Sequence, residues 1–156
     1  MIRIFSGSFF YGRGKVWNLN IILEMRLWHQ DLIPVLPRAQ LLGQHREICA
    51  LRGMGWGRRH SVVDYVFRRP YSDLFRFHVL VMDEMTRRGY RVDPIWRSPS
   101  YRGKRLGHDV SGFTAVHQKN PHGNVYPEHD PEYLNECLEN LKAKGIFPEP
   151  LTRKSF

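Results

Sequence analysis

Residues 25–57, MRLWHQDLIPVLPRAQLLGQHREICALRGMGWG, decide the fold because they hold the clearest helical pattern in the chain. Pro37 suits a first helical turn, where its missing N–H costs nothing, and Gly53 suits the stop. Between them, the residues that recur at the spacing of one helix face are Leu41, Leu42, His45, Ile48 and Cys49. We therefore predict a helix over residues 37–53 that packs on the core through this face.

Glu47 lies on this predicted helix, away from the centre of its apolar face, because each residue turns the helix by about 100°. Its neighbours on the same side are Gly43 and Ala50, whose small side chains leave room for a close approach. Arg46 is adjacent in sequence. Taken alone, these residues favour a solvated glutamate paired with Arg46; the alternative is a carboxylate that takes part in chemistry.

The charge of the chain is its most unusual bulk property. Its 156 residues suffice for one domain and carry a formal net charge of +9. Arginine outnumbers lysine by 18 to 6, and 16 of these 24 cations fall within residues 26–105, against seven acids. Because a guanidinium contacts phosphate through two parallel hydrogen bonds, this composition favours a nucleic-acid partner. The alternative is a basic protein without such a partner.

The cysteines and histidines do not follow the pattern of a metal centre. Cys49 and Cys137 each occupy an apolar helix position, as small buried residues do in a reducing compartment. The histidines of the second half match no ligand spacing: His108, His117, His122 and His129. We expect no metal and no cofactor. No apolar run is long enough to span a bilayer, so we expect no membrane partner and a cytoplasmic, nucleoid-associated protein.

Two further helices follow from similar signals. The first is predicted from Ser72, as N-cap, to Gly89, with a buried face of Leu74, Phe77, His78, Val81 and Met85. The second is predicted from Asp130, as N-cap, to Gly145, with a buried face of Leu134, Cys137, Leu138 and Leu141. The predicted fold is mainly α, a single compact domain of about three helices joined by long basic loops. We expect residues 1–24 to be a leader outside the native domain, residues 25–150 to form the domain, and residues 151–156 to fray.

The segments between the helices are the predicted nucleic-acid contacts. Alternating glycines at 53, 55 and 57 precede Arg58, Arg59 and His60, and glycine lets a backbone approach a phosphate. Residues 90–129 lack periodicity and mix aromatic with basic side chains, namely Trp96, Arg97, Tyr101, Arg102, Lys104 and Arg105. Such a mixture favours base stacking and charge contacts. A solvated basic loop is the alternative.

Several strings in the chain carry a family resemblance: MRLWHQDLIP, LLGQHREICALRGMGWG and SPSYRGK, followed by FHVLVMDEMTRRGY and YPEHDPEYLNECL. Over most of residues 25–145 the chain resembles the pyrimidine-dimer DNA glycosylases, whose best-known member is the phage endonuclease V-type repair enzyme. The resemblance is closest to a bacterial branch whose members open with MRLWHQ.

The resemblance implies a glycosylase and AP lyase that acts on damaged double-stranded DNA without metal. In the family, the free amine at the chain start attacks C1′ of the damaged nucleotide, and a helix glutamate preceded by an arginine serves the reaction. The matching positions are Met25 for the amine, followed in the sequence by Arg26, and Arg46 and Glu47 for the arginine and the glutamate. An α-amine has a reference pKa near 8, so more of it is neutral at pH 7 than of a lysine. We expect a monomer that bends DNA and extrudes a nucleotide.

The chain also departs from the phage enzyme. Leu27, Gln40 and Ala50 stand where that enzyme has an arginine, a histidine and a further arginine. We expect His29, Arg38 and Arg52 to replace them as DNA contacts. The aromatic C-terminal segment of the phage enzyme is absent. Because imine chemistry requires the amine near Glu47, we take Met25 as the biological start.

These departures motivate a second hypothesis, a non-catalytic basic module that binds nucleic acid. A third, a metal-dependent nuclease that uses the histidines, is the least favoured.

Overall fold

The computed structural model describes residues 26–53, 64–111 and 123–148, and every structural statement below concerns these ranges. The elements in chain order are η1 (Gln30–Val35), α2 (Arg38–Arg52), α3 (Asp64–Arg68), α4 (Tyr71–Arg87), η3 (Pro94–Arg97) and α5 (Pro131–Ala143). The described ranges contain an isolated bridge, between Tyr101 and His108, but no strand. The predicted mainly α class is confirmed, with three long helices and three short ones.

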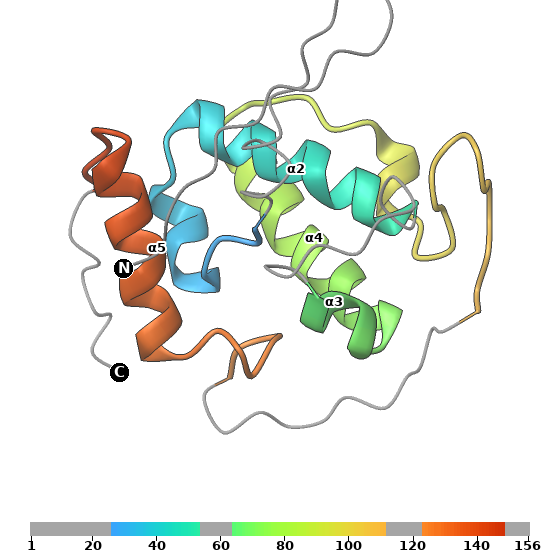
Figure 1. Ribbon diagram of the computed structural model, residues 1–156. Coiled ribbons are helices and arrows are strands. Elements are labelled where there is room, and N and C mark those ends of the chain that lie inside the picture. Colours follow the sequence, from blue (N-terminus) through green and yellow to red (C-terminus); the bar gives the residue numbers. More distant parts are fainter. Residues whose placement is uncertain (1–25, 54–63, 112–122, 149–156) are drawn as a thin grey trace, which may run out of the picture.

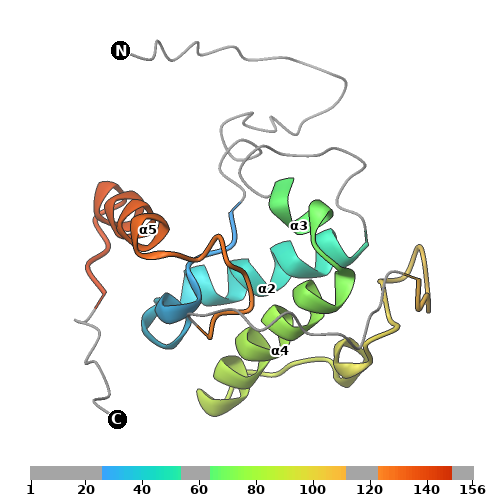
Figure 2. The ribbon, with the colours of Figure 1, turned by 90° about the horizontal axis from the view of Figure 1, so that it is seen from below.

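Helices α2 and α4 lie side by side and form the centre of the fold (Figures 1 and 2). Leu41 and Ile48 of α2 and Phe77 and Val81 of α4 are each 0% exposed. Burying one such side chain stabilises the fold by roughly 1.5–3 kcal/mol. This pair of helices therefore provides the rigid base for the site.

The predicted bounds of α2 agree with the structure, in which Pro37 is the N-cap and Gly53 the C-cap. The predicted buried face was partly wrong. The buried residues are Leu41, Gln44, Ile48, Leu51 and Arg52, whereas Leu42, His45 and Cys49 are half-buried. The helix is therefore rotated so that two polar side chains enter the core, where each finds hydrogen-bond partners.

Helix α4 starts earlier than predicted. Pro70 is its N-cap, and Ser72, the predicted cap, lies buried within the first turn. The predicted buried face of α4 is confirmed in full. At its C-terminal end, Arg88 donates to the carbonyl oxygens of Leu36 at 2.6 Å and Pro34 at 2.9 Å. This arginine fastens η1 to α4.

Helix α5 begins as predicted, with Asp130 accepting from the Tyr133 N–H at 2.8 Å. Its Cys137 and Leu141 are 0% exposed. The stop at Gly145 is confirmed, since this residue has φ +73°, a conformation that favours glycine. In both views α5 and the 98–111 segment lie at opposite ends of the α2–α4 pair (Figures 1 and 2).

The short elements η1, α3 and η3 were not predicted, because segments of four to six residues are too short to show a helical period. None of the helices in the described ranges combines the length and apolar character needed to cross a bilayer.

Candidate active site

Glu47 is a half-buried carboxyl on the middle of α2. Burial raises its pKa from the ordinary value of 4.5 to about 7. The positive charges of Lys144, Arg46 and Arg26 oppose this shift, in that order of strength. Near neutral pH the group therefore exists in comparable amounts as an acid and as a carboxylate, which suits proton transfer in either direction. The solvated-glutamate interpretation does not fit this environment.

Gln44, one turn before Glu47, connects that carboxyl to the start of the described chain. Its Nε2 donates to Glu47 Oε2 and to the carbonyl oxygen of Arg26, each at 3.1 Å. Its Oε1 accepts from the backbone N–H of Trp28 at 2.6 Å. Gln44 is 1% exposed and its bond to the Trp28 backbone is buried, whereas the bonds to Arg26 and Glu47 are partly buried. One buried amide thus fixes the backbone of residues 26–28 against the candidate catalytic carboxyl.

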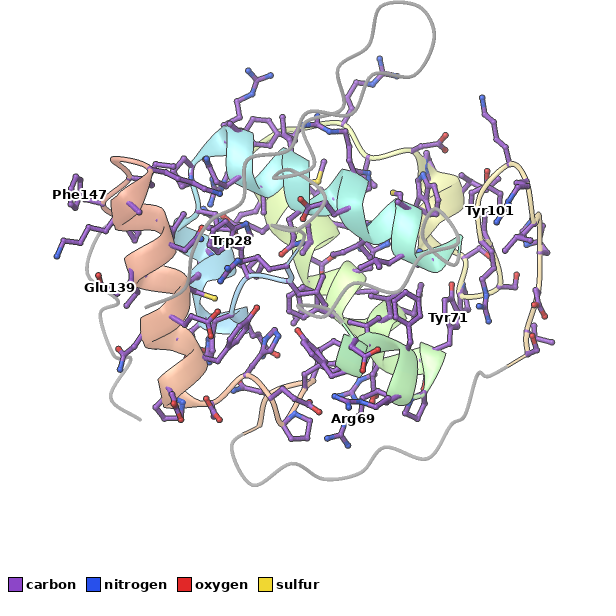
Figure 3. The ribbon with its side chains drawn as sticks, in the orientation of Figure 1. Trp28, Arg69, Tyr71, Tyr101, Glu139 and Phe147 are labelled. Atoms are coloured by element: carbon purple, nitrogen blue, oxygen red, sulfur yellow. The ribbon has the colours of Figure 1, made fainter. Side chains whose placement is uncertain are left out.

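Three cations surround Glu47, and they come from three separate parts of the chain. Arg26 directs its guanidinium toward α5, where Nη1 lies 3.3 Å from Glu136 Oε1. Arg46 is exposed on α2. Lys144, the C-cap of α5, holds its Nζ 5.5 Å from the ring centroid of Trp28, which Figure 3 shows between α5 and α2. The site is therefore a carboxyl within a cationic rim, suited to a polyanionic substrate.

A comparison with family models matches residues 25–98 to the family described as pyrimidine dimer DNA glycosylase. This segment belongs to that family. Comparison with curated proteins and with solved structures gives no match. The match supports a role in DNA repair with DNA as the substrate. The matched residues include Gln44 and Glu47 but end before the basic residues 102–105 and before α5.

Arg52 was predicted to contact DNA, and the structure corrects this. The side chain is 0% exposed and all five of its N–H groups are used. The acceptors are Tyr71 Oη, His78 Nδ1, and the carbonyl oxygens of Trp96, Ser98 and Tyr101, at 2.6–3.0 Å. No phosphate can reach this guanidinium. Its role is to fasten the segment 96–101 to the α2–α4 pair.

His29 was also predicted to contact DNA, and it too is buried, at 2% exposure. Its Nδ1 accepts from the Asp31 N–H at 3.1 Å, so its Nε2 carries the proton and donates to the carbonyl oxygen of His129 at 2.9 Å. His129 in turn accepts from the Gln30 N–H at 3.0 Å. Burial lowers the pKa of His129 to about 3, so its ring is neutral. Together these rings fix the chain that leads from residue 26 into η1.

The remaining predicted DNA contacts divide by exposure. Four of them are exposed, namely Arg38, Arg97, Lys104 and Arg105. Arg97 forms an ion pair with Asp83 at 2.5 Å, and the Arg38 guanidinium lies 5.5 Å from the ring centroid of Tyr90. These four stay predicted contacts.

The other members of that group are less accessible or lie outside the described ranges. Trp96 is half-buried against Tyr101, with ring centroids 4.9 Å apart. Tyr101 and Arg102 are each 9% exposed, and the Arg102 guanidinium lies 3.4 Å from the ring centroid of Tyr71. These three side chains therefore offer little surface to a nucleic acid. The predicted residues outside the described ranges are Met25, Arg58, Arg59 and His60.

His45, Cys49 and His78 approach one another closely enough to suggest a metal site. The protonation of these three side chains argues against a bound metal ion. Arg52 Nη1 donates to His78 Nδ1 at 3.0 Å, so the neutral His78 ring carries its proton on Nε2 and donates it to His45 Nδ1 at 2.8 Å. Burial also raises the pKa of the Cys49 thiol to about 12, which keeps the sulfur protonated. These residues do not fit a metal ion while Arg52 holds its place.

Sequence reasoning missed Gln44, His129 and Lys144 as parts of the site. Gln44 gave a signal, since it stands at the i+3 position from Leu41 on the buried face. Lys144 gave none, because it lies 97 residues after Glu47 in the sequence and only the fold lets its charge act on that carboxyl.

Proposed function

We propose that this protein is a DNA repair glycosylase with AP-lyase activity, acting on UV-type pyrimidine dimers or related damage through an imine at the amine of Met25. The observation that carries the proposal is the bridge from Gln44 to both the Arg26 backbone and Glu47. Met25 directly precedes Arg26 in the sequence, so this bridge supports the proposal that the amine of a chain starting at Met25 serves the same site as Glu47.

The proposed reaction starts when the neutral amine nitrogen attacks C1′ of the damaged nucleotide. The glycosidic electron pair leaves with the base, the nitrogen gives up a proton, and ring opening yields the imine. The carboxylate of Glu47 then takes a proton from C2′, and the electron pair released expels the 3′ phosphate. Water hydrolyses the imine and frees the amine. A Glu47 pKa near 7 supports both the acid and the base roles at neutral pH.

DNA is proposed to lie across the exposed cations. Lys104 and Arg105 stand on the 98–111 segment, and Arg46 and Arg38 stand on α2. The buried Arg52 supports this surface indirectly because it fixes the backbone of residues 96–101. Nucleotide extrusion costs least where the duplex is already damaged, which favours lesions over intact pairs.

Borohydride trapping tests the proposal. A chain that starts at Met25 is incubated with duplex DNA containing an abasic site or UV-induced dimers, and sodium borohydride converts any imine to a stable adduct. We expect an adduct at the Met25 nitrogen, and strand cutting slowed by about 10²–10⁴-fold in Glu47→Gln. The control is Glu139→Gln, an exposed glutamate on α5 that should leave both unchanged.

Absence of an adduct from the Met25 chain, or undiminished cutting by Glu47→Gln, would overturn the imine mechanism. Salt-dependent DNA binding without strand cutting would then indicate the non-catalytic binding module instead.

A further inference from the structure

Lys144 brings a side-chain amine to the candidate active site from the far end of the chain. It is the C-cap of α5, and its Nζ lies 5.5 Å from the ring centroid of Trp28. The backbone N–H of Trp28 donates to Gln44 Oε1. Among the cations that act on Glu47, Lys144 acts most strongly. The contacts of Trp28 therefore connect this amine with the Gln44 amide, and through that amide with the Glu47 carboxyl.

The other described lysines are placed differently. Lys104 lies on the 98–111 segment, at the end of the α2–α4 pair opposite α5 (Figure 1). Lys142 and Lys144 are both exposed at the C-terminal end of α5, but it is the Lys144 amine that lies over the Trp28 ring. Residues 26–103 contain no lysine. The charge of Lys144 opposes the raised pKa of Glu47.

We propose that Lys144 is a second imine-forming amine of this site, and that the substrate class it serves is DNA that already contains an abasic site. The inference rests on the proposed function, which places the damaged nucleotide at Glu47. An open abasic site presents a free aldehyde at C1′, an electrophile that needs no departing base. Attack on it therefore requires only an amine and a proton acceptor, whereas dimer removal also requires cleavage of a glycosidic bond.

The proposed reaction at an abasic site begins at the Lys144 amine. The neutral Nζ adds to the C1′ aldehyde, and the resulting carbinolamine loses water to give an iminium ion. The Glu47 carboxylate takes a proton from C2′, and the electron pair expels the 3′ phosphate as a leaving group. Water hydrolyses the remaining imine and releases Lys144. Neither an oxidant nor a metal ion takes part.

This second amine has a consequence for the full chain of 156 residues. Its α-amine is separated from residue 26 by 25 residues, so imine formation at Met25 is closed to it, whereas Lys144 keeps its place in the fold. The full chain is therefore expected to cut abasic DNA while leaving dimer-containing DNA intact.

The test is borohydride trapping of the full chain on abasic duplex DNA, with the adduct located by peptide mass spectrometry. We expect the adduct on Lys144 and its loss by about tenfold or more in Lys144→Arg, which keeps the positive charge but forms no imine. Lys142→Arg is the matched control, two residues earlier on the same helix, and should trap as the unchanged chain does.

Two results would overturn the inference: an adduct located on another amine, or an unchanged yield in Lys144→Arg. The chain that starts at Met25 keeps the two proposals apart. There the adduct is expected at the Met25 nitrogen and should survive Lys144→Arg, so failure of the Lys144 inference leaves the Met25 proposal standing.

Discussion

Replacing Gln44 with leucine should separate the start of the domain from its candidate catalytic carboxyl. The side chain is 1% exposed and makes hydrogen bonds to Trp28 N, Arg26 O and Glu47 Oε2. Leucine has a similar size but offers neither a donor nor an acceptor. The backbone N–H of Trp28 would then lose its hydrogen-bond acceptor in the core.

The expected cost follows from these contacts. A buried polar group left without a partner costs about 1–3 kcal/mol, and the Arg26 carbonyl adds a smaller amount because it lies nearer the surface. Gln44→Leu should therefore lower the free energy of unfolding by about 2–4 kcal/mol, a large part of the 5–15 kcal/mol typical of a domain. Urea unfolding followed by tryptophan fluorescence measures this difference.

A second variant separates geometry from stability. Gln44→Glu keeps an acceptor for the Trp28 N–H, but it turns a negative oxygen toward Glu47 and the Arg26 carbonyl, where the native amide donates. We expect it to raise the pKa of Glu47 further and to reduce trapping by the Met25 chain at pH 7, under conditions where the protein is folded. The control is Asn135→Leu, an exposed amide on α5, which should change stability by less than about 0.5 kcal/mol.

The reasoning fails if Gln44→Leu unfolds at the urea concentration of the native protein and traps abasic DNA equally well. Gln44 would then be a passive core residue, and the nearness of residue 26 to Glu47 would have no consequence for chemistry.

Three other sets of substitutions test the pKa of Glu47, the buried hydrogen bonds of Arg52 and the exposed cations Lys104 and Arg105. Burial raises the pKa of Glu47 from 4.5 to about 7, so the contribution of this group to stability is fully present below pH 4.5 and is lost as the pH rises through 7. Glu47→Gln should remove this pH dependence, which amounts to at most about 3 kcal/mol in the free energy of unfolding. The measurement compares unfolding free energies of the two proteins across this pH range. Arg52→Lys replaces five donors with three and should lower the free energy of unfolding by about 3–5 kcal/mol, whereas a loss below 1 kcal/mol in denaturant unfolding would contradict the buried network. Removing both Lys104 and Arg105 by alanine should reduce the slope of log binding constant against log salt by about 2, measured by fluorescence anisotropy with duplex DNA, and an unchanged slope would remove these residues from the interface.

The long helices were predictable because their signals are local. Pro37 and Gly53 bracket α2, and Asp130 and Gly145 bracket α5, each acting through backbone chemistry within one turn. Ser72 was the exception. A serine is a good cap, but Pro70 two residues earlier already had the extended conformation that starts α4.

The buried face of α2 was not predictable from hydrophobicity. Gln44 and Arg52 enter the core because their partners come from residues 26–28 and 71–101. The spacing of Gln44 from Leu41 suggested a buried position, but no local pattern in the sequence predicts these distant partners. The same holds for His29, which looks like a surface residue until His129 packs on it from a hundred residues away. The candidate carboxyl was found from the family resemblance, and its raised pKa required the structure.

The buried guanidinium of Arg52 also determines how the basic segment behaves before DNA arrives. The segment 96–101 cannot detach from the helices without leaving several donors unsatisfied in a dry interior, so it should open only together with α2 and α4. Its backbone amides are then expected to exchange with heavy water as slowly as those of the helical pair. A surface held in this way is organised in advance, and DNA binding loses little conformational entropy in ordering it.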